Sequence, residues 1–359
     1  MKRLLLLKTI TLLLGILFFS IHSVRAQEFN PSERAYKTDV SRKGTAAGTM
    51  LEIGVGARAE AIGGAFTAIA DDPSALYWNP AGITNISSIA AQFTRLNWLV
   101  DTKYHALDLV VPLPMLSWAL GFHLAMLDFG TSPVRTVFRP EGTGEFYSAK
   151  DMVAGLYLGM AITDRISVGL GAKYFYERIW HVDGSNIAFD VSILYKTALK
   201  GLRIGGAIAN FGPEFRLSGR DLTRSMDSDG RRDIFFNNDQ VPVNLETEKY
   251  PLPLLFRFGL AYDWEFNQNN MLTISSDLNH PSSSTESINM GLEFKTMNAF
   301  YLRAGYQSLF ERGATNGLTL GGGLKYKVLG QSTITVDYSW SDWSILDSVN
   351  RFTVGISAF

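Results

Sequence analysis

The stretch Thr333-Ile-Thr-Val-Asp-Tyr-Ser-Trp-Ser341 alternates between polar and apolar side chains along its whole length. Successive side chains of a β-strand point to opposite faces of the sheet, so this pattern predicts a strand with one apolar and one polar face. The same alternation recurs at residues 165–177, 256–264 and 317–328. The chain is therefore expected to be built mainly from β-strands.

The length of these segments favours a membrane setting. They approach the roughly 9–11 residues that a tilted strand needs to cross a bilayer, whereas strands of soluble proteins average about 5–6. Hydrophobic residues make up 46% of the chain, yet none of the later stretches approaches the roughly 18 uninterrupted apolar residues of a membrane helix. Tyrosine and tryptophan gather at segment ends, as in an aromatic girdle: Trp98, Tyr174, Tyr176, Tyr262, Trp264, Tyr338, Trp340 and Trp343. We predict an all-β fold, a transmembrane antiparallel β-barrel; a soluble sandwich is the alternative that would also alternate.

The connections between the segments test the number of strands. About fourteen strands are predicted, near 87–99, 103–112, 116–128, 150–162, 165–178, 184–196, 201–211, 252–264, 270–280, 285–295, 299–309, 316–328, 331–343 and 350–359. Short and longer connections alternate along this series, and the two longest, residues 129–149 and 212–251, fall in the same set. Because outer-membrane barrels have short periplasmic turns and longer external loops, this parity supports an even number of strands.

The first residues predict export. Lys2 and Arg3 precede an apolar run over residues 4–19, and Val24-Arg25-Ala26 offers small residues for cleavage before Gln27. Residues 1–26 are therefore predicted to be a signal peptide, with a membrane anchor as the alternative, and the predicted location is the outer membrane of a Gram-negative type of cell, in contact with its lipid. Residues 27–43 are polar and are expected to be a flexible segment. Net charge is −1, so nothing indicates a nucleic-acid partner.

Residues 44–86 differ in amino-acid composition from the barrel strands, which are assigned to residues 87–359. They are rich in Gly and Ala and contain Asp71-Asp-Pro-Ser-Ala-Leu-Tyr-Trp-Asn-Pro-Ala-Gly82. Asp72 before Pro73 predicts a helix start, Asn79-Pro80 predicts its end, and Gly82 predicts a turn into the first strand. We predict a small helical plug threaded through the periplasmic mouth, and a catalytic or metal-binding pair is the alternative for Asp71 and Asp72.

Enzymatic function has little support in the sequence. There is no cysteine, which excludes a disulfide, a thiolate metal site, a thiol nucleophile and a lipoprotein anchor. The glycines of Gly54-Val-Gly56 lack the context of a dinucleotide site. The histidines are scattered without metal-like spacing: His22, His105, His123, His181 and His280. We expect no catalytic residue, metal or cofactor, although a Ser/His/Asp site assembled across strands is left open.

The segment 63–82 resembles the N-terminal signature of the PorV/PorQ family, within the wider group of FadL-like outer-membrane barrels. Asn79, Pro80, Ala81 and Gly82 match the end of that signature, residues 44–58 fit its lead-in, and residues 337–340 and 351–359 look like the family's last two strands. The resemblance implies a fourteen-strand barrel with an N-terminal plug. It implies two functions: PorV-like members receive exported proteins in type IX secretion, and FadL-like members let hydrophobic small molecules cross.

The sequence favours the protein-binding function. The long predicted loop 212–251 mixes charged and aromatic residues, and its candidate partner-binding residues are Arg216, Arg220, Arg224, Arg231, Arg232, Phe235 and Phe236. A solvated lid is the plainer interpretation of that loop. Passive uptake of hydrophobic small molecules, the alternative function, needs an apolar interior. The predicted inward positions instead look charged: Asp108, Lys173, Asp190, Arg203, Arg257, Asp263, Asp277, Glu293, Arg303, Lys325 and Asp337.

Overall fold

A computed structural model describes residues 42–227, 240–311, 313–328 and 332–358. The predicted signal peptide and nearly all of the predicted flexible segment lie outside these ranges. The described residues belong to one compact unit. Within them, no helix has the length and apolar character needed to cross a membrane.

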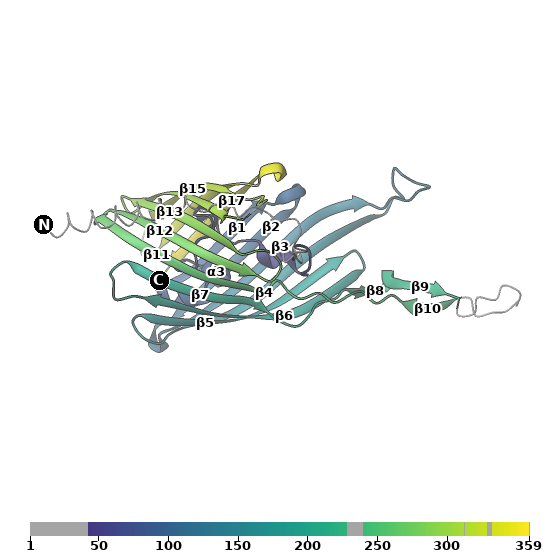
Figure 1. The fold of residues 1–359 in the computed structure, drawn as a ribbon, viewed down its shortest axis with the longest axis horizontal. Coiled ribbons are helices and arrows are strands. Elements are labelled where there is room, and N and C mark those ends of the chain that lie inside the picture. Colours follow the sequence, from purple (N-terminus) through teal and green to yellow (C-terminus); the bar gives the residue numbers. More distant parts are fainter. Residues whose placement is uncertain (1–41, 228–239, 312, 329–331, 359) are drawn as a thin grey trace, which may run out of the picture. The chain divides into compact units, whose positions relative to one another are not determined.

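Fourteen strands of the described chain form a closed antiparallel barrel (Figure 1), which confirms the predicted fold and strand number. The first and last of these strands, β1 and β17, pair from Ile89↔Ala358 to Asn97↔Asn350 and so close the sheet on itself. The strands are β1 (Ile89–Asn97), β2 (Lys103–Leu113), β3 (Trp118–Pro133), β4 (Phe146–Ala161), β5 (Ile166–Ile179), β6 (Val182–Lys196), β7 (Leu202–Phe211), β11 (Leu255–Asn267), β12 (Asn270–Pro281), β13 (Ser287–Thr296), β14 (Phe300–Leu309), β15 (Leu318–Lys327), β16 (Thr333–Asp342) and β17 (Ser348–Ala358).

The two ends of the barrel differ. The β3–β4 connection and the segment between β7 and β11 extend from the same end (Figure 1), as the parity of the connections predicts. We call this the outer end and the opposite one the inner end. The predicted loop 129–149 is shorter than expected, because β3 continues to Pro133 and β4 begins at Phe146, past a bulge at residues 128–131. Between β7 and β11 lie β8 (Ser218–Gly219), the 3₁₀ turn η6 (Arg220–Leu222) and the paired strands β9 (Thr223–Met226) and β10 (Val241–Asn244).

Alternation places apolar side chains on the outside of the barrel. In β17, Phe352, Val354 and Ile356 are about half exposed, whereas Arg351 and Thr353 point inward and are almost completely buried. A belt of exposed apolar side chains suits a lipid environment, since a closed barrel leaves no backbone group unpaired toward hydrocarbon.

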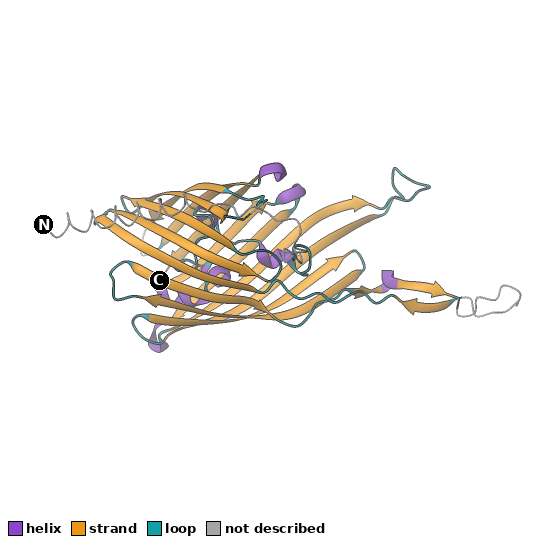
Figure 2. Cartoon of the chain, in the orientation of Figure 1, coloured by secondary structure: helices purple, strands orange, loops and turns teal. Residues whose placement is uncertain are grey.

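The plug lies inside the barrel and contains short helices (Figure 2): η2 (Thr49–Glu52), α2 (Ala57–Ala61), α3 (Ala75–Trp78) and η3 (Pro80–Asn85). Ile62, Phe66 and Leu76 are fully buried. The segment runs along the barrel rather than only through its inner mouth. Its start packs near the outer end, where Ala47 donates to the Pro251 carbonyl, and its last residues lead into β1 at the inner end.

Candidate functional site

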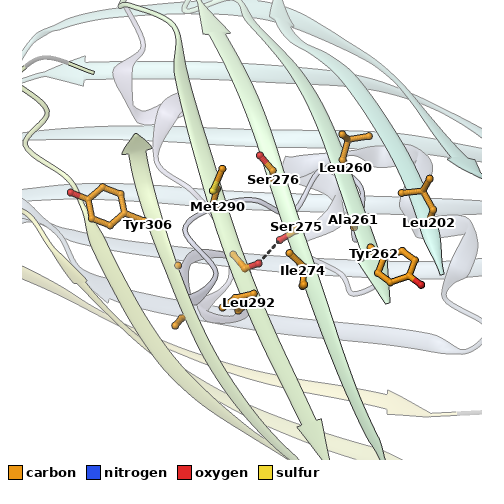
Figure 3. Close-up of a pocket in the computed structure, with 13 residues that line it drawn as sticks. Leu202, Leu260, Ala261, Tyr262, Ile274, Ser275, Ser276, Met290, Leu292 and Tyr306 are labelled. Carbon is orange, nitrogen blue, oxygen red and sulfur yellow. Dashed lines mark hydrogen bonds between the residues drawn. The ribbon is translucent and has the colours of Figure 1, made fainter. Parts of the chain in front are cut away.

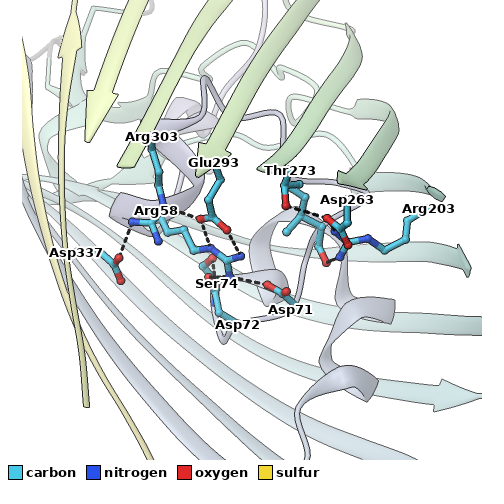
Figure 4. A network of polar contacts seen from close by, with 11 residues as sticks. Arg58, Asp71, Asp72, Ser74, Arg203, Asp263, Thr273, Glu293, Arg303 and Asp337 are labelled. Carbon is cyan, nitrogen blue, oxygen red and sulfur yellow. Dashed lines mark hydrogen bonds and ion pairs between the residues drawn. The ribbon is translucent and has the colours of Figure 1, made fainter. Parts of the chain in front are cut away.

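An ionic network anchors the plug to the barrel wall (Figure 4). Arg58 of α2 makes two parallel hydrogen bonds to Glu293 of β13, Nε to Oε2 and Nη2 to Oε1, both at 2.8 Å. Arg303 of β14 bonds the same carboxylate at 2.6 Å and also Asp337 of β16 at 2.6 Å. Paired guanidinium–carboxylate contacts of this kind fix geometry as well as charge. The network therefore holds α2 against three strands.

The predicted aspartate pair belongs to this network. Asp71 Oδ1 accepts from Arg58 Nη1 at 2.5 Å, and Asp72 Oδ2 lies 3.3 Å from the same nitrogen. Burial raises the pKa of Asp72, and Arg58 offsets part of that rise. Burial alone would lower the pKa of Arg58, but Asp71 and Glu293 outweigh it and raise that pKa well above its usual value. The geometry makes the two carboxylates partners of Arg58, with no group of metal-binding residues among the described part of the chain.

The helix predicted after Asp72 begins later than expected. Asp72 Oδ1 accepts from the backbone N–H of Ser74 at 2.9 Å, which is a capping contact. However, Ser74 is the residue that precedes α3, and Pro73 lies before the helix rather than at its first position. The Asp72 side chain stabilises a turn that leads into the helix.

Asn79 and Pro80 end α3 as predicted and at once begin η3. Asn79 is fully buried; its Nδ2 donates to the carbonyls of Thr67 at 2.7 Å and Ile193 at 3.0 Å, and its Oδ1 accepts from Ala81 N. Gly82 does not form the predicted turn into the first strand. It lies within η3, where a Cβ atom would be 1.9 Å from the Ala70 carbonyl oxygen. This segment therefore ties the plug to itself and to β6.

The charges predicted to face inward do so, and most are buried. They form separate contacts: His123 with Asp108 at 2.7 Å, Lys173 with Asp190 at 2.9 Å, and Arg203 with Asp263 at 2.8 Å. Asp277 Oδ2 accepts from the backbone N–H of Thr67, and Arg257 donates to the Tyr77 carbonyl. Lys325 is exposed and lines the inner cavity described below. Arg351, which was not among the predicted positions, is buried beside Glu60 at 3.2 Å.

The interior also has an apolar sector that the sequence analysis missed. Near the outer end, the inner faces of β1–β6 present Leu96, Tyr104, Ala106, Ala125, Leu127, Val153, Phe175 and Ala188. The start of the plug fills this sector with Met50, Leu51, Ile53 and Val55, and the long connection adds Phe215 and Leu252. This part of the wall is thus apolar, whereas the pairs His123–Asp108 and Lys173–Asp190 lie next to it on the same strands, toward the inner end.

Two cavities lie on either side of the plug. The inner cavity, of about 380 Å³, is lined by Asp71, Asp72 and Pro73 and by the inner ends of strands. The outer chamber, of about 420 Å³, is lined by Tyr77, Trp78 and Glu60 of the plug and by the outer ends of β11–β14, β16 and β17. Residues 71–78 therefore separate the two spaces.

The exterior of the barrel wall, as distinct from its outer end, carries an apolar groove of about 530 Å³ over β11–β14 (Figure 3). Leu260, Tyr262, Ile274, Met290, Leu292 and Tyr306 surround it. Behind it, inside the barrel, Ile62 and Gly63 approach the backbone so closely that a Cβ on Gly291 or Gly305 would collide with them. Here the wall is a single layer of backbone between plug and exterior.

The loop residues predicted to meet a partner are only partly described. Arg216 pairs with Glu246, Arg220 contacts His181 Nε2 at 2.6 Å, and Arg224 donates to the Asp221 carbonyl at 3.0 Å. Arg231, Arg232, Phe235 and Phe236 lie outside the described residues. Arg216 and Arg224 thus make contacts within the loop, Arg220 links it to the β5–β6 turn, and Arg216 and Arg220 line a pocket of about 540 Å³.

The buried carboxyl of Glu52 predicts a pH effect. Burial raises its pKa, partly offset by the hydrogen bond from Ser283 and by Arg257. An acid with a raised folded-state pKa favours folding below its unfolded value and loses that contribution as pH rises through the folded value. We expect Glu52→Gln to leave the unfolding midpoint in urea unchanged at pH 4 and to raise it at pH 8. An equal shift at both pH values would contradict this.

Comparisons with known proteins bear on the fold. Residues 26–145 match the model of a family described as "Uncharacterised protein family (UPF0164)". No curated protein has a matching sequence. The structure is similar to the Pseudomonas putida toluene transporter TodX, with a TM-score of 0.52 and 14% identity over 85% of this chain and 97% of that one. It is similar to the monoaromatic hydrocarbon channel CymD, with a TM-score of 0.52 and 12% identity over 85% and 96% of the chains. At these identities the likeness shows a shared fold alone.

Proposed function

We propose that the protein is an outer-membrane barrel that lets small apolar compounds cross, with residues 44–86 as its plug. The observation that carries this proposal is the apolar inner sector of β1–β6, which residues 50–55 occupy. A compound that displaced these side chains would exchange one apolar contact for another, whereas the ionic network would keep α2 attached to β13 and β14. The fold shared with hydrocarbon channels supports the same class of solute, and those relatives are channels rather than enzymes.

Uptake by cells with a tight outer membrane tests this proposal. Cells that produce the protein are expected to take up labelled toluene or decanoate faster than cells with an empty vector, with no change for labelled glutamate. Leu127→Asn, which places an amide in the apolar sector and keeps the number and branching of the side-chain heavy atoms, is expected to reduce the gain. Its heat-induced shift in gel mobility should match the unmodified protein, as evidence of a folded barrel. Equal rates of toluene and decanoate uptake in cells with and without the protein would contradict the proposal.

A second candidate is the PorV/PorQ-type role, in which the outer end receives exported proteins of a type IX system. One observation favours it: the paired strands β9 and β10 extend from the outer end (Figure 1), and all four residues of β9, Arg224 among them, are exposed. Such a surface suits transient recognition of a folded partner. The test is deletion of the gene followed by analysis of surface proteins. Unchanged export and attachment would exclude this role.

A further inference from the structure

The outer chamber differs in character from the apolar sector beside it. Its lining combines indole and phenol rings with carboxamides, hydroxyls and charged groups. Its volume of about 420 Å³ lies in the roughly 300–1,000 Å³ range of small-molecule sites. A hydrocarbon placed here would leave buried polar groups without partners, which is costly. The chamber therefore calls for a ligand other than the apolar compounds proposed above.

Aromatic rings supply its flat surfaces. Trp98 and Trp343 contact each other edge to face, with ring centres 4.9 Å apart, and both line the chamber. Tyr77 and Trp78 form a second edge-to-face pair at 5.0 Å on the plug side. The Arg257 guanidinium lies over both of these rings, 4.7 Å from the centre of Tyr77 and 4.9 Å from that of Trp78, so the ring faces left for a ligand are those of Trp98 and Trp343. The faces of such rings are electron-rich and attract the C–H groups of a saturated ring.

Side-chain amides supply donors and acceptors together. Asn279, Asn289, Gln307 and Asn316 all line the chamber. Asn289 uses its Oδ1 to accept from Ser308 N, which leaves its amino group for another partner. Asn279 makes no side-chain hydrogen bond within the described part of the chain. Because a carboxamide both donates and accepts, it matches a hydroxyl group, which does the same.

The charges of the chamber balance one another. Lys43 pairs with Glu311 at 3.0 Å, and Arg351 lies 3.2 Å from Glu60. The remaining charged groups, Arg257 and Glu52, attract each other and are of opposite sign. A charged ligand would face an equal number of repelling groups, so the balance favours an uncharged one.

Arg351 offers the most specific contact. Its side chain is 1% exposed, and its Nε and Nη1 atoms have no hydrogen-bond partner within the described residues, although Glu60 lies close to Nη1. Buried donors normally have partners, and an unfilled one marks a place for a ligand or a water. A neutral oxygen can accept from these donors without displacing the Glu60 carboxylate.

We propose that the outer chamber binds an uncharged, hydroxyl-rich molecule of monosaccharide size. Its C–H face packs on Trp98 and Trp343, and its hydroxyls bond Asn279, Asn289 and Arg351. The inference goes beyond the proposed passage of apolar compounds and does not depend on it, since it concerns binding at the outer end alone.

The test is ligand-observed saturation-transfer NMR on the full mature chain in lipid nanodiscs, prepared without sugar-based detergent. The probes are the methyl glycosides of glucose, galactose, mannose and N-acetylglucosamine, with octanoate and toluene as comparators. At least one glycoside is expected to receive saturation and to bind about fivefold more weakly to Trp343→Leu, the effect of losing one aromatic contact. Trp264→Leu, which changes a tryptophan on the outer face of β11, is the matched control and should not weaken binding.

A second pair of variants guards against misfolding of the first. Asn279→Leu is expected to weaken glycoside binding, whereas Asn269→Leu, in the turn between β11 and β12, is not. Absence of saturation for all four glycosides overturns the proposal, as does a glycoside signal that persists unchanged in both Trp343→Leu and Asn279→Leu. Toluene uptake by cells is measured separately, so failure here leaves the proposed passage of apolar compounds standing.

Discussion

Replacing Arg58 by methionine is expected to lower the stability of the plugged barrel by about 3–5 kcal/mol, the usual cost of removing one partner of a buried ion pair. The variant loses the two bonds to Glu293 and the contacts to Asp71 and Asp72, and it leaves those carboxylates beside one another. Arg58→Lys keeps the charge but not the paired geometry, so an intermediate loss is expected. The measurement is the unfolding midpoint in guanidinium chloride, with the heat-induced shift in gel mobility as the readout of the folded barrel.

The matched control is Lys200→Ala. Lys200 forms an ion pair with Glu265, but both side chains are mostly exposed at the inner end, so no measurable change is expected. A second readout separates plug release from general destabilisation: planar-bilayer recordings of Arg58→Met should show more frequent current steps than the unmodified protein. An unfolding midpoint equal to that of Lys200→Ala would show that the network does not hold the plug.

Adding one methyl group at Gly205 is expected to dislodge the plug. A Cβ at this inward position of β7 would lie 2.3 Å from the carbonyl oxygen of Thr67, and Gly259 faces the same plug segment from β11. Because the collision is with backbone, no side-chain rotation can relieve it. Gly205→Ala is expected to cost about 1–3 kcal/mol, as overpacking of a tight interior does, and to expose the plug to protease.

Gly206, the next residue, provides the control. It faces outward, and its Cβ would meet the Ile193 side chain at 3.4 Å and the Arg257 carbonyl oxygen at 4.0 Å, which are ordinary contact distances. Gly206→Ala should therefore match the unmodified protein in unfolding midpoint and in the rate of cleavage within residues 44–86. Equal behaviour of the two variants would mean that the plug does not rest on β7.

The barrel was predictable because period-two alternation is a local signal. Residues 333–341 show it without reference to any other part of the chain. The plug network was not predictable, because Arg58 and Glu293 are 235 residues apart and nothing local links them. Because Arg58 is held in place by Glu293, the role of Asp71 as a second partner of Arg58 could not be predicted either.

The apolar inner sector was missed for a different reason. Small inward residues such as Ala106 and Ala125 alternate with larger apolar residues that point outward. Both faces of these strands are therefore apolar, and alternation of polar and apolar residues does not mark the inner face. Arg351, by contrast, could have been found. It has the opposite parity to Phe352 and Val354, which are outward, so the same alternation places it inside.

The junction of β1 and β17 has a consequence for assembly. Thr353 of β17 accepts a hydrogen bond from the Ala57 N–H at 2.9 Å, and the two residues are 296 positions apart. Strand β17 therefore closes the sheet and also completes the surface on which α2 packs. Contacts so distant along the chain form slowly, because the long loop between them must be closed first. A barrel that closed without the plug would leave Glu293 without Arg58 and Thr353 without its bond from Ala57.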